Sequence, residues 1–402
     1  MIKYLPFLLV ASLITCCVEV DISIPSFPDI SDYFAISDGL TQLTIAANFF
    51  GFCLSSAVYG PLSDAFGRRV VMLIGNVIML VGACGCVIAD SIELLLLARF
   101  VQGIGASTSA VVAFAMVADS YSAEKAASLI GTMNSLITIF MSVAPIAGGF
   151  LNETVGWRGS YTTIAVLSVV SWIALYFWLP ETKKHFDKFS SGKMLQDYKI
   201  LLTDSRFMYA SLVPSLSFSG WMSFVSCSSF LYMETYDLPI MYYALHQGAV
   251  LGVFSISSHY CGRISRLIGE KNCVRYGNMI MVMGGVSMVI IAIVADRSPY
   301  LTTISMLLYS FGAAIIYPII FVKSLEIFPE ISGTASSAIM AMRALICAIS
   351  IAITAYFYHG ELITVAYMVL GGASLVAVLS IRLLKLVQFA TKRDVAIITQ
   401  KI

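Results

Sequence analysis

The chain has 402 residues, of which 59% are hydrophobic and only 12% are charged, and its formal net charge is +1. Because soluble domains carry about 25% charged residues, this composition excludes an ordinary water-soluble protein and indicates a membrane protein. The near-zero net charge argues against nucleic acid as a partner. Four histidines and nine scattered cysteines form no metal-ligand spacing and no CxxC pair, so we expect no metal, no cofactor and no disulfide framework.

Twelve stretches of the chain are apolar over the roughly 20 residues that a helix needs to cross a bilayer. The first stretch imitates a signal peptide, but it is one of a dozen such stretches, and we interpret it as a span. The predicted fold is therefore an all-α, polytopic membrane protein. The predicted spans are 5–26, 41–62, 70–89, 93–117, 127–150, 159–179, 207–230, 243–262, 275–295, 301–322, 333–357 and 362–386.

The long polar stretch from Glu181 to Arg206 separates six spans from six spans. This division predicts a first six-helix bundle at 1–180, a linker at 181–206, a second six-helix bundle at 207–386 and a tail at 387–402. The predicted loops and ends on the side of the N-terminus hold 19 of the 24 lysine and arginine residues, and the opposite loops hold only Arg158 and Arg297. By the positive-inside rule, the linker and both termini are cytoplasmic.

One loop pattern occurs in both halves. Gly60 begins GPLSDAFGRR after the second span, and Gly262 begins GRISRLIGEK after the eighth. Both segments follow G-x-x-x-charge-x-x-G-charge-charge, and they lie about half the chain apart. A generic basic turn would explain the composition, but the matched spacing favours a duplicated six-span unit, as in many secondary transporters.

The first of these loops resembles the loop signature of the major facilitator superfamily, although Ala65 stands where the family usually has arginine. RFVQGIGA, which begins at Arg99, and APIAGG, which begins at Ala144, resemble the motifs of the fourth and fifth spans. DISIPSFP, which begins at Asp21, is similar to a segment of the Bcr/CflA drug–proton antiporters, with Ser23 replacing a tyrosine. The resemblance implies a proton-coupled exporter.

Among the charged residues of the predicted spans, four stand out: Glu19, Asp21, Arg99 and Arg343. Intramembrane charges are costly and usually functional. Asp21 and Arg99 fall at similar depth, so we expect them to couple to protons, the alternative being a static pair. Glu19 points about 200° away from Asp21 on a regular helix, and it either binds cationic compounds or pairs with a neighbouring helix. Arg343 either pairs with an acid or receives an anionic substrate.

Aromatic residues with nearby hydroxyls suit amphipathic ligands. We therefore assign Trp221, Phe224 and Tyr317 to the substrate site together with Glu19 and Arg343, although such residues also serve as packing elements. Pro145, Gly148 and Gly149 give the fifth span a thin, bendable point. The remaining residues expected to control the conformation belong to the first repeated loop, apart from one acid at the inner end of the fourth span. They are Gly60, Asp64, Gly67, Arg68, Arg69 and Asp119. Asp64 is expected to lie in space beside the N-terminus of the eleventh span. Arg68 or Arg69 is expected to pair with Asp119.

The sequence thus predicts a monomeric carrier in the bacterial inner membrane that exports small amphipathic compounds in exchange for protons. A dedicated carrier of one metabolite, such as a siderophore or an amino acid, and including an importer, is the alternative. An enzyme is not expected, because the chain has no HExxH, no Walker loop and no GxSxG on a strand.

Overall fold

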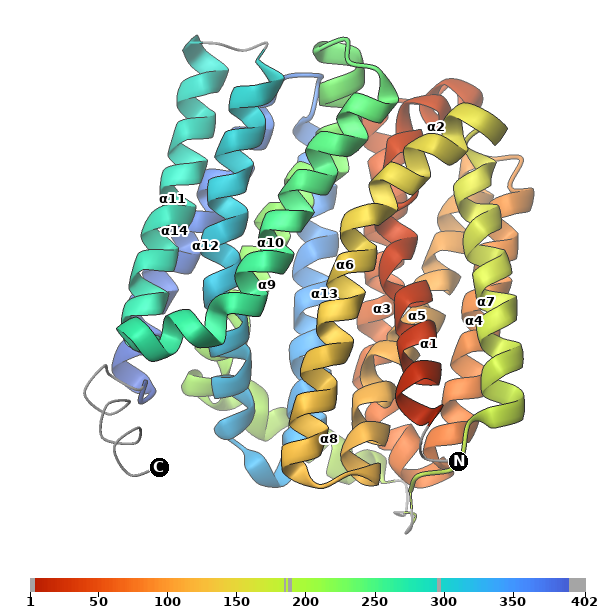
Figure 1. Ribbon diagram of the computed structural model, residues 1–402, viewed down its shortest axis with the longest axis vertical. Coiled ribbons are helices and arrows are strands. Elements are labelled where there is room, and N and C mark those ends of the chain that lie inside the picture. The colour runs from red at the N-terminus through yellow and green to blue at the C-terminus, as the bar shows by residue number, and fades with distance from the viewer. Residues whose placement is uncertain (1–3, 184–185, 187–189, 295–297, 390–402) are drawn as a thin grey trace.

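The computed structural model describes residues 4–183, 186, 190–294 and 298–389, and this part of the chain folds into long, roughly parallel helices (Figure 1). The first half contains α1 (Leu5–Asp21), η2 (Ile24–Ser26), α2 (Phe27–Phe34), α3 (Asp38–Phe66), α4 (Arg68–Ile88), α5 (Ile92–Ser120), α6 (Ala123–Val155) and α7 (Arg158–Trp178). After α8 (Ser191–Thr203), the second half contains α9 (Ser205–Phe230), η3 (Leu231–Thr235), α10 (Ile240–Ile268), α11 (Glu270–Val294), α12 (Pro299–Glu326), η4 (Pro329–Ile331), α13 (Ser332–Phe357) and α14 (Leu362–Leu386).

Eleven segments within the described residues are long and apolar enough to cross a membrane, with Leu5–Phe34 counted as one of them. They correspond to all of the predicted spans except 207–230. The helices are longer than the predicted spans; α6, for example, covers Ala123–Val155 where 127–150 was expected. Hydropathy detects only the apolar middle of each helix, and the polar ends continue the same backbone. The prediction of an all-helical polytopic fold is confirmed.

The helix α9 corresponds to the predicted span that is absent from these eleven. It has 26 residues, enough for a bilayer, and it is rich in serine. It packs against α12, α13 and α14, and nearly all of its residues from Ala210 onward are buried. Several serine hydroxyls donate to carbonyl oxygens one turn earlier, as Ser215 does to Ser211 at 2.7 Å. Surrounded by protein, α9 does not need the apolar surface that a lipid-facing helix requires.

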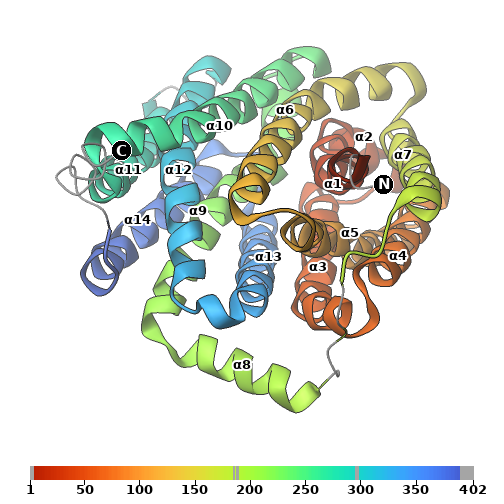
Figure 2. The ribbon, with the colours of Figure 1, turned by 60° about the horizontal axis from the view of Figure 1, so that its bottom comes forward.

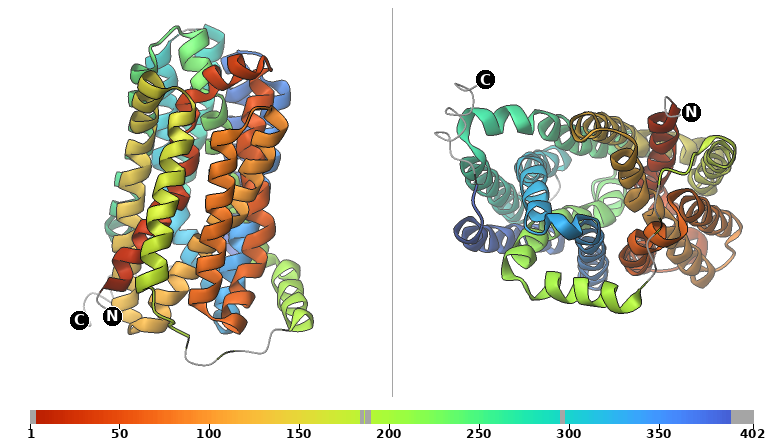
Figure 3. Two further views of the ribbon diagram at one scale, coloured as in Figure 1. Left: turned by 90° about the vertical axis from the view of Figure 1, so that its right-hand side faces the viewer. Right: turned by 90° about the horizontal axis from the view of Figure 1, so that it is seen from below.

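We call the face at which α1 begins and α14 ends the inner face, and the opposite face the outer face. The two halves lie side by side in the view from the inner face, and α8 runs below them (Figure 2; Figure 3, right). The hydroxyl of Tyr198 in α8 donates to the carbonyl of Ala57 in α3 at 2.8 Å. Leu201, at the end of α8, belongs to a cluster with Ala335, Ala338 and Ile339 of α13. The linker helix therefore contacts both halves.

The first span is broken rather than continuous. Its α-helix ends at Asp21, and Pro25 and Pro28 follow in the short segments η2 and α2. Proline lacks an amide proton, so carbonyl groups one turn earlier lose their usual donors. The backbone amide of Ser26 donates to Ser23 rather than to Ile22, and Ser160 of α7 donates to the Ile22 carbonyl instead, at 2.9 Å. The break places Asp21 at a helix end inside the bundle.

Candidate functional site

The centre of the first half holds an ion pair between Glu19 of α1 and Arg99 of α5. One carboxylate oxygen lies 3.6 Å from the Arg99 guanidinium, and the other accepts a hydrogen bond from Asn48 of α3 at 3.0 Å. Glu19 is 2% exposed and Arg99 is 0% exposed. The pair therefore joins three helices in a place that water does not reach.

Further polar contacts orient Arg99. It donates to the amide oxygen of Gln102 at 2.8 Å, and its guanidinium lies 5.8 Å from the ring centre of Tyr161 in α7. Two of its nitrogens, Nε and one terminal nitrogen, are buried without a partner among the described residues. Gly103 lets α5 approach the backbone of Asn48, where a side chain would collide. Close packing thus fixes the position of the cation.

Asp21 does not form the expected pair with Arg99. Its side chain is 0% exposed, and neither carboxylate oxygen has a hydrogen-bond partner in the described part of the chain. Glu19 and Asp21 point in different directions from α1, as expected from the helical geometry, and it is Glu19 that faces Arg99. Asp21 instead lies next to Ile22, whose backbone packs against Gly148 of α6.

Two glycines let α6 pack closely against the broken first span on one side and against α10 of the second half on the other. A side chain at Gly148 would collide with the backbone of Ile22, directly after Asp21. One at Gly149 would touch Ala244 of α10 at 3.3 Å. Gly148 and Gly149 therefore form a closely packed seam between α1, α6 and α10. The helix α6 continues through Pro145 without interruption.

Arg343 of α13 has no acidic partner among the described residues. It donates to the hydroxyl of Tyr317 in α12 at 2.6 Å, and its guanidinium lies 5.1 Å from the ring centre of Phe218 in α9. The ion pair that sequence reasoning kept open is therefore not present in this conformation. Phe218 was not anticipated from the sequence; the only signal was its place one turn before Trp221.

An apolar pocket of about 30 Å³ lies between α6, α9 and α10. Phe218 and Trp221 form one of its walls, and Phe254 stacks on Trp221 at 6.3 Å. Phe224, which the sequence assigned to the substrate site, is not part of this wall. It is 1% exposed and packs against Tyr232 in the core of the second half, because it lies on a different face of α9.

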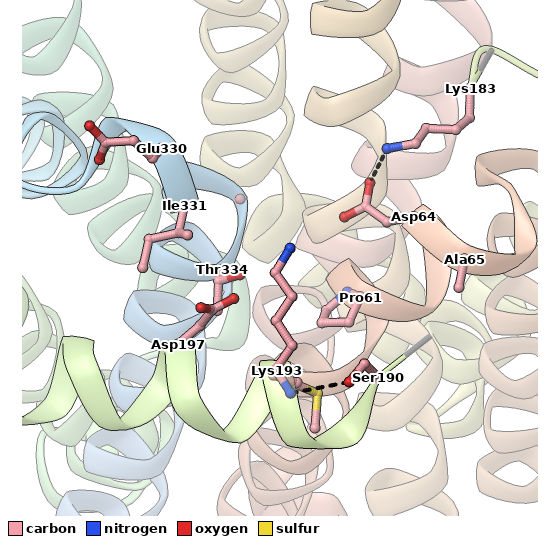
Figure 4. A pocket seen from close by; sticks show the side chains of 12 residues that line it. Pro61, Asp64, Ala65, Lys183, Ser190, Lys193, Asp197, Glu330, Ile331 and Thr334 are labelled. Atoms are coloured by element: carbon pink, nitrogen blue, oxygen red, sulfur yellow. Dashed lines mark hydrogen bonds and ion pairs between the residues drawn. The ribbon is translucent and has the colours of Figure 1, made fainter. Parts of the chain in front are cut away.

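Charges at the inner face join the first repeated loop to its neighbours. Arg68 contacts Asp119 of α5 at 3.0 Å and Asp64 at 2.8 Å, which agrees with the pairing expected for Arg68. Lys183 of the linker contacts Asp64 at 2.7 Å. Asp64 therefore does not bond to the start of α13 in this conformation. It lines a cavity of about 280 Å³ together with Thr334 of α13 (Figure 4).

The linker supplies a contact that sequence reasoning missed. Both oxygens of Glu181 accept hydrogen bonds at 3.0 Å from the backbone amides of Arg68 and Arg69. Those amides begin α4, where a negative charge is favoured. Gly67 precedes them with φ of 96°, a conformation that favours glycine. Arg69 itself donates to the carbonyl of Tyr176 in α7 at 2.7 Å, and Gly60 faces Ser337 of α13.

The repeated loop has a related contact in the second half. Gly269 has φ of 86° and ends α10, as Gly67 ends α3. Glu270 at the start of α11 pairs with Lys323 of α12 at 3.5 Å. The two loops therefore carry an ion pair between corresponding helices, with the signs reversed. Membrane-length helices in two groups, with an ion pair buried at the centre of the first, are the arrangement of a multi-pass membrane protein that keeps charges inside its bundle.

Comparison with known proteins agrees with this class. A sequence profile described as Major Facilitator Superfamily matches residues 9–351, and the chain belongs to that superfamily. It is accordingly a secondary transporter and not an enzyme. The chain also superposes on the partially occluded, inward-open xylose transporter XylE of Escherichia coli with a TM-score of 0.72 and 16% identity, over 95% of this chain and 98% of that one.

Two bacterial relatives have names that state a resistance. The chain is 22% identical to a bicyclomycin resistance protein homolog of Haemophilus influenzae over 326 residues, which cover 81% of this chain and 82% of that protein. It is 25% identical to the multidrug resistance protein MdtM of Escherichia coli over 296 residues, which cover 73% and 72%. The expected membership of the superfamily and the resemblance to drug-resistance carriers are confirmed.

Proposed function

We propose that the chain is a proton-coupled antiporter that exports small amphipathic compounds across the bacterial inner membrane by alternating access. The observation that carries the proposal is the pair of acids in the broken first span. Glu19 is balanced by Arg99, whereas Asp21 is buried without a partner in the described part of the chain. The similarity to carriers named for multidrug resistance supports export of drug-like compounds.

Asp21 is the residue that we assign to the proton. An ionised carboxylate without a partner is expensive in a dry interior, whereas the neutral acid is tolerated. Asp21 ends α1, next to the close contact between Gly148 of α6 and the backbone of Ile22. Gain or loss of a proton there changes the charge at the boundary between the halves, which is where rocking motion takes place.

Arg99 acts on this site indirectly in our proposal. By holding Glu19 and Asn48, it fixes the rotation of α1 about its axis and thereby the direction in which Asp21 points. The contacts of Asp64, Arg68 and Asp119 at the inner face hold the ends of α3, α4 and α5 together while the halves move. Trp221 and Tyr317 contribute to the substrate site.

One observation favours a second candidate function. Arg343 has no counter-charge among the described residues, as expected of a carrier dedicated to one anionic metabolite. Such a carrier would work in either direction and would show a strict requirement for Arg343. A multidrug exporter would accept cationic and neutral compounds as well.

Substrate-triggered proton flux in proteoliposomes tests the proposal. We compare the wild type with Asp21→Asn and with the matched control Asp90→Asn, whose side chain is exposed in the loop before α5, across cationic, neutral and anionic compounds. The proposal requires that some compounds drive proton movement, that Asp21→Asn abolishes it and that Asp90→Asn does not. Equal proton movement in Asp21→Asn and wild type would make Asp21 a structural residue. Transport without proton movement would exclude proton coupling altogether.

A further inference from the structure

Arg343 lies near the middle of α13, a helix of 26 residues, and hence near the middle of the membrane. One terminal nitrogen donates to the Tyr317 hydroxyl, and the Phe218 ring lies below the guanidinium. These two contacts orient the cation but do not neutralise it. An unneutralised charge at this depth marks a functional site.

Arg343 has no carboxylate partner among the described residues. No acid in this part of the chain forms an ion pair with it, and one of its terminal nitrogens donates to the Tyr317 hydroxyl instead. The Phe218 ring beside the guanidinium also contacts Phe49 of α3, so the cation lies near the first half. Glu19, two residues further along α1, is already bound to Arg99 and Asn48.

The arginines in the middle of α5 and α13, Arg99 and Arg343, differ in accessibility. Arg99 is fully enclosed, and its unpartnered nitrogens cannot meet a ligand. Arg343 keeps part of its surface accessible although it lies deep in the bundle. Its remaining N–H groups are therefore available to a molecule that enters between the halves.

The Phe218 ring that lies against this cation contacts aromatic rings of both halves. The ring of Phe218 lies 6.4 Å from that of Phe49 in α3 and 5.5 Å from that of Trp221. The apolar pocket beside Phe218 and Trp221 extends this surface towards α6 and α10. The site thus combines an apolar surface for a flat hydrophobic body with one positive charge at its edge.

We propose that Arg343 binds a carboxylate group of the transported compound, so that the substrates include amphipathic aromatic monocarboxylates. A guanidinium offers two parallel N–H groups to a carboxylate, and such a pair is stronger than a neutral hydrogen bond. Binding neutralises the charge of Arg343 at the moment when the site closes around the ligand. The inference uses the central site of the proposed function but does not depend on proton coupling.

Three ligands with one scaffold test the inference: 2-naphthoate, 2-naphthamide and (2-naphthylmethyl)trimethylammonium. Isothermal titration calorimetry on the full chain in nanodiscs gives the Kd of each for wild type, Arg343→Gln and Arg343→Lys. We expect wild type to bind the carboxylate about tenfold or more tightly than the amide. Arg343→Gln should remove this preference and leave the Kd of the amide unchanged, and Arg343→Lys should keep part of it.

Arg382→Gln is the matched control, because it removes an arginine of the same half that is exposed at the inner end of α14. It should retain the preference for the carboxylate. Tyr317→Phe provides a second variant should Arg343→Gln not fold; it removes the hydroxyl that orients the guanidinium and should weaken binding of the carboxylate by a few-fold more than binding of the amide.

Several results would overturn the inference. Wild type could bind the amide or the ammonium compound as tightly as the carboxylate, or Arg343→Gln could keep the preference. A loss of binding for all three ligands alike in Arg343→Gln and Tyr317→Phe would assign Arg343 to the conformational change instead. Failure of proton coupling leaves these binding results untouched, because calorimetry on nanodiscs involves no proton gradient.

Discussion

The two halves of the carrier share a scaffold but distribute their polar groups differently. The first half encloses a balanced cluster in which Arg99 meets Glu19, Asn48 and Gln102. The second half has hydroxyl pairs, such as Ser228 with Tyr243 at 2.8 Å, and the single charge of Arg343. We infer that duplication left each half free to specialise, the first for the proton and the second for the substrate.

The largest expected effect separates the two arginines. Arg99→Met leaves Glu19 buried without its cation and should lower the free energy of unfolding by about 3–5 kcal/mol. Arg343→Met leaves no acid behind and should be nearly neutral. Unfolding in a denaturing detergent titration measures both, and the double variant Glu19→Gln/Arg99→Met should recover much of the loss. Equal destabilisation by the two single variants would contradict the contrast between the halves.

The seam between the halves gives the next effect. Gly148→Ala places a methyl group against the Ile22 backbone and should cost up to about 3 kcal/mol, with slower transport. Gly131→Ala is the control in the same helix, since nothing lies within 4 Å of a side chain there. Thermal unfolding and uptake by proteoliposomes measure the two variants. A Gly148→Ala protein with wild-type stability and rate would show that α6 does not need this close approach.

The reversed ion pairs of the two loops can be compared directly. Arg68→Gln removes a donor from Asp119 and should cost about 2 kcal/mol, because that carboxylate is partly buried. Glu270→Gln should cost less than about 1 kcal/mol, since its 3.5 Å pair with Lys323 is looser. The thermal midpoint in detergent ranks the two. If Glu270→Gln proved the more harmful, the second loop would be the principal structural contact.

The smallest effect concerns pH at the start of the second half. Asp204 caps α9, and its hydrogen bond from Arg206 holds the pKa of that carboxyl below its usual value. A carboxyl with a depressed pKa stabilises the fold above its unfolded pKa, and this stability is lost as the pH falls through the folded pKa. Asp204→Ala should cost about 0.5–2 kcal/mol at neutral pH.

Arg206→Gln should make the acid-dependent loss begin at a higher pH, because the pKa of Asp204 moves back towards its usual value. Thermal midpoints of wild type and Arg206→Gln between neutral and acidic pH measure the shift. Asp204→Ala serves as the control and should show no difference when Arg206→Gln is added. Identical pH profiles for wild type and Arg206→Gln would indicate that the cap does not depend on the arginine.

The sequence predicted the fold well because lipid imposes a simple rule on every exposed helix. The same rule explains why α9, the predicted span 207–230, is not one of the eleven apolar segments: it is surrounded by protein and can carry many serines. The choice between Glu19 and Asp21 as the partner of Arg99 depended on the rotation of α1, which residue spacing does not determine. Glu181 caps α4 from more than a hundred positions away in the sequence, and no local sequence pattern predicts such a contact.

The absence of an acidic partner for Arg343 could not be predicted from the sequence either, because the positions of charged residues along the chain do not determine which of them form ion pairs. The sequence left open whether Arg343 pairs with an acid or receives an anionic substrate. In the structure one arginine and one acid remain apart, and it is these two unmatched groups that the proposed function uses.

We expect the linker helix α8 to influence the turnover rate of the carrier through its contacts with both halves. Its Tyr198 bonds to α3, and its apolar side packs against α13, so separation of the inner ends of these helices must first undock the linker. Burial raises the pKa of the Tyr198 phenol, which therefore keeps its proton and remains a donor throughout the physiological range. We expect that weaker contacts of α8 would lower the activation energy of this separation, so that the inner ends of the two halves would open faster and close less tightly.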